Sequence, residues 1–238
     1  MPTWRRVLAW AAVLAALAVV AVVLVPHWRS GEPGLRYVVP ATELAAAQAA
    51  LTELPVRGRA PLTGYDRSLF GPAWADTDHN GCDTRNDVLA RDLTGMTTDG
   101  ETGGCVVLTG VLADPYGGKV IAFERGAQSS QVQIDHVVAL ADAWQKGAAQ
   151  WTADRRQEFA NDPANLLAVD GPNNQAKGAG DAATWLPPNR GYRCAYVIRQ
   201  VLVKAAYGLW VTAAEHDAME RWLARCETAG SPAAVPGG

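Results

Sequence analysis

One group of polar residues in this sequence has types and spacing that suit chemistry. His136 directly follows Asp135. Further along the chain, Asn165 lies nine residues before Asn174, which lies three residues before Lys177. A neutral imidazole is a general base near neutral pH, carboxylate and amide oxygens bind hard divalent cations, and an ammonium group binds anions. The group therefore combines a proton acceptor, ligands for a cation and an anion-binding side chain.

The elements around these residues must bring them together. Alternation, apolar runs and turn residues predict a strand, a helix, a second strand and a second helix, at residues 132–138, 139–147, 166–169 and 173–177. Neighbouring side chains on a strand point to opposite faces, so a site that uses both Asp135 and His136 needs a bulge or the end of the strand there. We expect a strand-loop-strand-helix arrangement with its polar ends facing inward.

This combination suits the hydrolysis of a phosphodiester. That reaction requires a base for the attacking water, a cation for the charge that grows on the phosphate, and a group that orients the base. His136 can act as the base, and the carboxylate of Asp135 can hold the cation. An ordinary structural pair, with the aspartate in a turn and the histidine in the core, is the alternative for this dipeptide.

The segments that hold these residues resemble a known motif. IDHVVAL followed by NLLAVDGPNNQAKG resembles the HNH, or His-Me finger, nuclease motif, and its spacing is similar to that of the HNH domain of RNA-guided nucleases. From about residue 66 to 226 the chain resembles the DUF1524-type secreted actinobacterial HNH endonuclease family. The segments that carry this wider resemblance are CDTRNDVL, DPYGG, DHVVALADAW, NLLAVDGPNNQAKG, WLPPN and the closing cysteines.

The resemblance implies a role for each residue of the group. His136 would be the general base, Asp135 and Asn174 would be the metal ligands, and Asn165 would fix the loop that holds His136. Asn174 stands where the name-giving pattern has a second histidine. An amide oxygen beside a carboxylate suits a hard cation, so Mg²⁺ or Mn²⁺ is favoured over Zn²⁺.

Nucleic acid, DNA or RNA, is the substrate that this resemblance implies. Lys177 or Arg85 would hold the substrate phosphate, and Trp185 is the tryptophan chosen for substrate contact. The formal net charge of −3 argues against a protein that coats nucleic acid, but a nuclease needs only a local positive track. Candidates for that track are Arg85, Arg91, Lys177, Arg190 and Arg193.

The expected fold class is α+β, with a ββα-metal (His-Me finger) core, a β-hairpin, surrounding helices and two disulfides. The hairpin is predicted from the alternation over residues 105–113, the DPYGG turn and a strand over 119–123. The other predicted helices cover residues 41–54, 85–93, 152–161, 194–207 and 212–226.

The four cysteines form no CxxC pair, and their wide spacing does not resemble a structural zinc site. Two disulfides are expected, for which the sequence allows three connectivities. We favour Cys82 with Cys105 and Cys194 with Cys226, because each bridge then closes a local loop.

The N-terminal part of the chain indicates export. Arg5 and Arg6 precede an uncharged apolar run over residues 7–25, nearly long enough to span a bilayer. Residues 1–26 are expected to be a signal anchor or a signal peptide, residues 27–50 a linker with an Ala-rich helix, residues 51–228 the HNH nuclease domain and residues 229–238 a disordered tail. The expected protein is a monomer, either secreted or a single-pass membrane protein with its domain outside the cell.

Two other kinds of protein were weighed against a nuclease. A catalytically silent cell-envelope module that binds nucleic acid or a wall polymer has no need of a base beside a metal site. A protease or amidase lacks support, because the sequence holds no GxSxG, HExxH or free cysteine nucleophile. The loop DTDHNGCD superficially resembles a calcium site but lacks the glutamate and spacing of an EF-hand, so a solvated turn is favoured.

Overall fold

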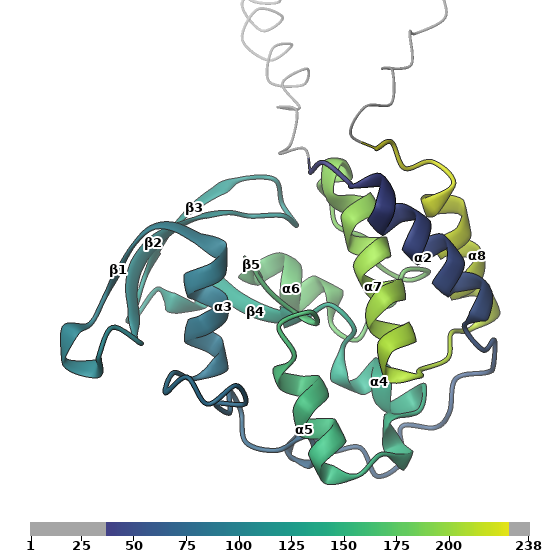
Figure 1. Cartoon of the computed structure of the whole chain (residues 1–238), viewed down its shortest axis with the longest axis horizontal. Coiled ribbons are helices and arrows are strands. Elements are labelled where there is room, and N and C mark those ends of the chain that lie inside the picture. Colours follow the sequence, from purple (N-terminus) through teal and green to yellow (C-terminus); the bar gives the residue numbers. More distant parts are fainter. Residues whose placement is uncertain (1–36, 229–238) are drawn as a thin grey trace, which may run out of the picture. The chain divides into compact units, whose positions relative to one another are not determined.

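The computed structural model describes residues 37–228 (Figure 1). The signal anchor or signal peptide expected at residues 1–26, the start of the expected linker and the tail at 229–238 lie outside this range. Within residues 37–228, no helix has the length and apolar character that a membrane crossing requires.

A three-stranded antiparallel sheet holds the predicted hairpin. Its strands are β1 (Leu93–Thr98), β2 (Val107–Ala113) and β3 (Val120–Glu124), in that spatial order. The turn between β2 and β3 is closed by Asp114, whose carboxylate accepts the backbone N–H groups of Tyr116 and Gly117. The hairpin is confirmed, whereas β1 was not predicted, because only Leu93 of its six residues is buried.

A second, two-stranded sheet carries Asp135 and His136. Strand β4 (Val132–His136) pairs antiparallel with β5 (Leu166–Asp170), with Asp135 opposite Leu167 and His136 opposite Leu166. The helices α4 (Leu140–Gln145) and α5 (Ala153–Asn161) lie between the two strands in sequence, and α6 (Gly171–Lys177) begins where β5 ends. The predicted order of strand, helix, strand and helix is confirmed, with α5 added as predicted after the Thr152 cap.

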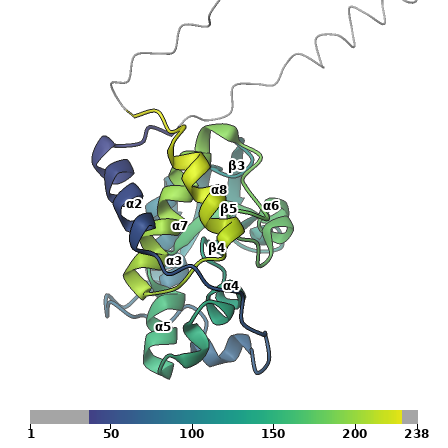
Figure 2. The ribbon, with the colours of Figure 1, turned by 90° about the vertical axis from the view of Figure 1, so that its right-hand side faces the viewer.

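Three helices form a separate packed group, seen side by side in Figures 1 and 2. They are α2 (Ala41–Glu53), α7 (Arg193–Tyr207) and α8 (Ala213–Leu223), and each contacts the other two. The predicted capping box of Thr212 and Glu215 begins α8. Leu44, Ala47 and Leu51 of α2 are buried in the same core as α7 and α8. The packed body therefore includes the Ala-rich helix that was expected to precede it.

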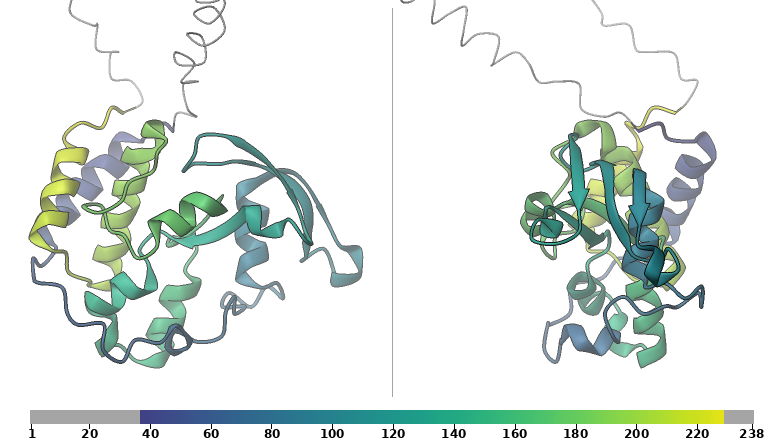
Figure 3. Two further views of the ribbon diagram at one scale, coloured as in Figure 1. Left: turned by 180° about the vertical axis from the view of Figure 1, so that it is seen from behind. Right: turned by 90° about the vertical axis from the view of Figure 1, so that its left-hand side faces the viewer.

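Helix α3 (Thr84–Asp92) connects the two sheets. It contacts β1, β2 and β5, and Figure 3 shows it against the three-stranded sheet. Val88 and Leu89 of this helix are buried together with Ile134 of β4 and Leu166 of β5. Burial of these apolar side chains fixes the strand that carries Asp135 and His136 relative to the larger sheet.

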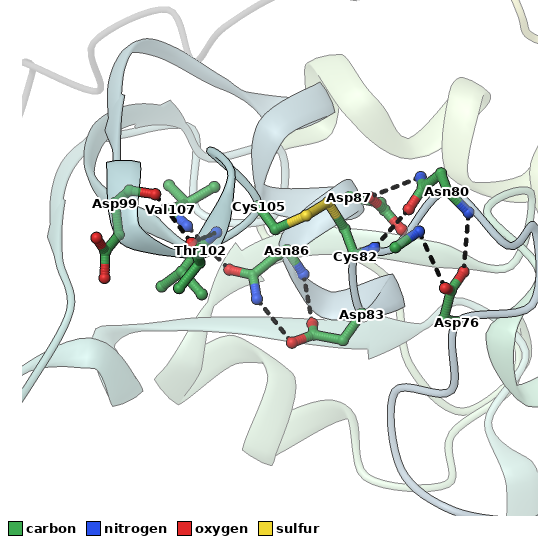
Figure 4. Close-up of a disulfide and its surroundings, with 12 residues drawn as sticks. Asp76, Asn80, Cys82, Asp83, Asn86, Asp87, Asp99, Thr102, Cys105 and Val107 are labelled. Atoms are coloured by element: carbon green, nitrogen blue, oxygen red, sulfur yellow. Dashed lines mark hydrogen bonds between the residues drawn. A yellow bond between two sulfur atoms is a disulfide. The ribbon is translucent and has the colours of Figure 1, made fainter.

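Both predicted disulfides are present. Cys82 is bonded to Cys105, which ties the loop before α3 to the chain that enters β2 (Figure 4). Cys194 is bonded to Cys226, which ties the start of α7 to the segment after α8. In the first region, Asn86 reinforces the link, because its side chain donates to Asp83 and accepts the backbone N–H of Val107.

A buried network of charges joins α4, α7 and α8. The Lys146 ammonium lies 2.6 Å from Glu215 and 2.6 Å from Asp142. The Lys204 ammonium lies 2.7 Å from Asp142 and 2.8 Å from Glu215. Both lysine side chains are fully buried, so these pairs fix the helices in one arrangement.

Candidate functional site

Asp135 is buried between two hydrogen-bond donors. Its Oδ1 accepts from the Lys177 ammonium at 2.9 Å, and its Oδ2 accepts from the Tyr116 hydroxyl at 2.5 Å. The ammonium of Lys177 also donates to the backbone carbonyl of His136 at 2.8 Å. Burial raises the pKa of Asp135, and the Lys177 charge and the two hydrogen bonds oppose that rise. Lys177 therefore joins α6 to the end of β4 as a buried partner of the carboxylate.

His136 is held by the end of helix α5. Its Nε2 lies 2.8 Å from the backbone carbonyl oxygen of Ala160. A carbonyl oxygen can only accept, so the neutral imidazole must carry its proton on Nε2. Its Nδ1 then has a free lone pair, and no group among residues 37–228 donates to it. The end of α5 thus selects the tautomer in which Nδ1 is the proton acceptor.

The imidazole of His136 is neutral in this environment. Burial lowers its pKa to about 3, although the hydrogen bond to Ala160 opposes the shift. The positive charges of Arg67 and Lys177 lower the pKa further. A neutral imidazole is the form that can accept a proton, but a pKa well below the working pH makes it a weak base. A bound phosphate anion near the ring would raise the pKa toward the useful range.

The carboxylate and the imidazole lie on opposite faces of β4. The register between β4 and β5 continues through both residues without a bulge, so adjacent side chains alternate. Gln133 shares the face of Asp135, and its side-chain oxygen accepts from the Asn174 amide at 2.9 Å. The structure therefore brings Asp135, Asn174 and Lys177 to the face that α6 covers, and it does not bring the His136 ring to that face.

Asn165 holds the chain that follows His136. Its side-chain oxygen accepts the backbone N–H of Val138 at 2.8 Å, and its side-chain nitrogen donates to the Val138 carbonyl at 3.2 Å. Its own backbone carbonyl accepts the N–H of Val137. Asn165 is fully buried, so these three bonds are shielded from water. They fix the exit from β4 immediately after the imidazole.

In this arrangement the Asp135 carboxylate is not free to bind a divalent cation. Both of its oxygens already accept hydrogen bonds, its exposed fraction is 5%, and the Lys177 ammonium occupies the adjoining space. A cation there would lie beside another cation in a buried environment, which is unfavourable. Among residues 37–228, no three His, Cys, Asp or Glu side chains are grouped to hold a metal ion. The oxygen of the Asn174 amide remains available, because only its nitrogen is engaged with Gln133.

A cavity of about 290 Å³ opens beside His136. Its wall combines the segment from Arg67 to Trp74 with Leu140 and with Ala160 and Asn161 at the end of α5. The indole of Trp74 is nearly parallel to the His136 ring, at 14° and a centroid distance of 6.3 Å. The imidazole therefore faces a mainly apolar cavity with an aromatic wall.

The other side chains chosen for substrate contact lie in different surroundings. Trp185 is half-buried and contacts the rings of Tyr116 and Tyr196 edge-on. Arg85 is half-buried on α3 and makes no hydrogen bond or ion pair with the described residues, and burial lowers its pKa. Their contacts with a substrate stay predictions, as does a phosphate-binding role for Lys177, whose side chain is fully buried.

Three residues of this region were missed by reasoning from the sequence. Tyr116 lies in the DPYGG turn, and a fully buried tyrosine in a turn needs a partner for its hydroxyl, which is Asp135 here. Arg67 begins a single-turn 3-10 helix, η1 (Arg67–Phe70), and Trp74 lies in the loop that follows, so no periodicity marks them. Their proximity to His136 arises only from the packing of that segment on α5.

The acidic loop before α3 uses its carboxylates internally. Asp76 accepts the backbone N–H groups of Asn80 and Gly81, and Asp78 accepts the side-chain amide of Asn80. Asn80 also donates to Asp87 at 3.2 Å, and it accepts the N–H of Cys82 (Figure 4). These bonds are those of a turn fixed by the disulfide.

Comparisons with known proteins bear on the same part of the chain. Residues 83–222, which include Asp135, His136, Asn165, Asn174 and Lys177, match the family of GmrSD restriction endonucleases, C-terminal domain. A protein of Arthroderma benhamiae described as an uncharacterized secreted protein is 41% identical over 184 residues, which cover 76% of this chain and 85% of the relative. No solved structure matches the chain. Because the matched segment covers more than half of the sequence, the chain belongs to the family of the C-terminal domain of GmrSD restriction endonucleases.

Proposed function

We propose that this chain is an HNH-type endonuclease that hydrolyses phosphodiester bonds of DNA or RNA, with His136 as the general base. Membership of a restriction endonuclease family supports the reaction class. The single observation that carries the residue assignment is the hydrogen bond from His136 Nε2 to the Ala160 carbonyl. It leaves Nδ1 as the proton acceptor of a ring that lines an open cavity.

The reaction follows from this tautomer. Nδ1 of His136 accepts a proton from a water molecule as the water oxygen bonds to phosphorus. The bond from phosphorus to the 3′ oxygen breaks, and the departing 3′ oxygen takes a proton from solvent. The products are a 5′ phosphate and a 3′ hydroxyl. Nε2 keeps its proton throughout, and the Ala160 carbonyl stabilises the imidazolium that forms.

Asn165 is proposed as the positioning residue for this base. Its three hydrogen bonds to Val137 and Val138 hold the chain immediately after His136, and they do not involve the imidazole itself. A ring whose backbone is fixed keeps its distance to the phosphate. Substitution of Asn165 is therefore expected to reduce the rate more than it weakens substrate binding.

A divalent cation, Mg²⁺ or Mn²⁺ rather than Zn²⁺, remains part of the proposal through Asp135 and Asn174. The donor set is hard oxygen, which supports that choice. In the described arrangement, Lys177 must first release Asp135. No step of the reaction above is routed through the ion.

The proposed place of action is outside the cytoplasm, either as a secreted protein or on a membrane anchor. The Arthroderma benhamiae relative is described as a secreted protein, which supports export. Two disulfides support it as well, because such bonds persist in oxidising compartments.

Plasmid cleavage by the purified full chain tests the proposed function. Wild type in Mg²⁺ is expected to convert supercoiled plasmid to nicked and linear forms, and His136→Ala is expected to lose that activity. His216→Ala is the matched control, because His216 lies on α8 away from the cavity. Binding of the plasmid without any cleavage would instead indicate the silent binding module.

A further inference from the structure

We propose that the cavity beside His136 binds one unpaired nucleobase of the substrate, next to the phosphate that is cleaved. This inference rests on the proposed nuclease function and adds that the substrate is single-stranded or locally unpaired nucleic acid. The cavity has a volume of about 290 Å³, near the lower end of the ~300–1,000 Å³ of ligand pockets. It therefore suits a single ring system rather than a longer stretch of nucleic acid.

Trp74 provides a flat aromatic wall for a base. The indole is half-buried, it lines the cavity, and its plane is within 14° of the His136 ring. Its backbone has a φ of +61°, a conformation that large side chains rarely adopt. Such strain persists only where surrounding contacts enforce it, and it is concentrated at ligand-binding positions. The fold thus holds this indole at the cavity despite the unfavourable backbone.

Asn161 provides an unpaired acceptor in the cavity wall. The residue is 2% exposed, and its side-chain nitrogen donates to the Gln157 carbonyl at 2.9 Å. Its side-chain oxygen accepts no hydrogen bond from the described residues. A buried acceptor without a donor is unfavourable, and a shift of this side chain toward the cavity would let the ring N–H or amino group of a base donate to it. Apart from this amide, Arg67, Ser68 and His136, the lining is apolar.

Arg67 provides a cation for the attached phosphate. The residue is exposed and lines the cavity. Arg67 and His136 line the same cavity, so the two groups are near each other. A base against Trp74 would therefore place its own phosphate between a cation and the proton acceptor.

The position of the cavity determines the form of the substrate. A base inside a duplex is stacked on both faces and paired at its edge, so it can enter a cavity only after it leaves the stack. Single strands already present unstacked bases, which bind aromatic side chains without strong sequence preference. The chain is therefore expected to cleave single-stranded or locally unpaired nucleic acid faster than intact duplex.

A single-stranded oligothymidylate with one abasic tetrahydrofuran residue tests this proposal. With wild type, cleavage at the phosphates beside the abasic residue is expected to be about tenfold slower than elsewhere on the strand. Trp74→Leu, which keeps an apolar side chain but removes the flat face, is expected to cleave all positions at similar rates. Trp74→Phe should restore part of the difference. Trp210→Leu is the control, since that tryptophan lies outside the cavity.

Binding measured by fluorescence anisotropy separates this proposal from the nuclease proposal. The full chain is expected to bind labelled oligothymidylate about tenfold more tightly than a fully abasic strand of equal length, and Trp74→Leu is expected to abolish the difference. Tighter binding of oligothymidylate without any cleavage would support base binding in the cavity and would contradict the proposed nuclease activity. Equal cleavage rates at all positions, together with equal binding of both strands, would overturn the proposal that the cavity binds a base. The proposed nuclease activity would still stand. Equal binding without cleavage would overturn both.

Discussion

His136 and Ala160 lie 24 residues apart in the sequence, and the imidazole Nε2 lies 2.8 Å from the backbone carbonyl. Ala160 belongs to the last turn of α5, where carbonyl groups have no partner within the helix. The histidine satisfies one of these carbonyls, and in return the helix fixes which ring nitrogen carries the proton. This mutual arrangement gives the neutral His136 ring a defined tautomer before any substrate binds.

Replacement of Lys177 by methionine is expected to destabilise the fold by about 3–5 kcal/mol, because the Asp135 carboxylate would remain buried without a counter-charge. The double variant Asp135→Asn with Lys177→Met is expected to recover much of that loss. Urea denaturation monitored by tryptophan fluorescence measures both. A single variant within about 1 kcal/mol of wild type would show that the pair behaves like an exposed ion pair.

Removal of divalent cations is expected to slow plasmid cleavage by on the order of a hundredfold or more, and Mg²⁺ or Mn²⁺ should restore it. Asn174→Ala is expected to need a higher Mg²⁺ concentration than wild type. Asn173→Ala is the matched control, because Asn173 is the neighbouring residue and its side-chain amide donates to Asp170. Full activity in EDTA would contradict the proposed cation.

Acid is expected to destabilise the buried charge network. Burial alone would raise the pKa of Asp181, but the hydrogen bond and charge of Lys146 lower it to about 2. Because this is below the ~3.9 of an unfolded aspartate, Asp181 stabilises the fold above about pH 4 and loses that contribution as pH falls toward 2. The melting temperature of Asp181→Asn should therefore fall less steeply over this range. The same dependence of melting temperature on pH in Asp181→Asn as in wild type would show that Asp181 does not contribute to this acid sensitivity. Asp217→Asn is the control, because Asp217 is exposed.

Loss of the Cys194–Cys226 disulfide is expected to cost about 3–4 kcal/mol, from the entropy gained by an unfolded chain without this loop. The double variant Cys194→Ser with Cys226→Ser tests this in urea. The Cys82–Cys105 bridge closes a shorter loop, so its removal should cost slightly less. Stability unchanged in the first double variant would mean that helix packing and the buried ion pairs hold α7 and α8 together without this bridge.

Much of the fold could be predicted from local patterns. Thr152 and the Thr212–Glu215 capping box mark where α5 and α8 begin, and the DPYGG turn marks the hairpin. Strand β1 escaped prediction because it holds Gly95 and three threonines on an exposed surface. Its place is determined by pairing with β2, which is a long-range contact.

The candidate site was predictable only in part. The sequence correctly placed Asn165 immediately before the second strand, and Asn174 and Lys177 on the helix that follows it. The partners of these side chains were not predictable. The DPYGG turn predicts the hairpin but not the contact of Tyr116 with Asp135, and no periodicity marks Trp74. The burial of Lys204 could have been predicted, since it lies three residues after the buried Val201 on the same face of α7.

The identity of the base is tested most directly by chemical rescue. His136→Ala of the full chain is expected to cleave a single-stranded oligonucleotide about 10²–10⁴-fold more slowly than wild type. Added imidazole should then restore part of the rate with saturation, because the substitution opens space beside the existing cavity. His216→Ala should retain the wild-type rate and not respond to imidazole. A His136→Ala rate close to that of wild type would contradict the assignment of His136 as the general base.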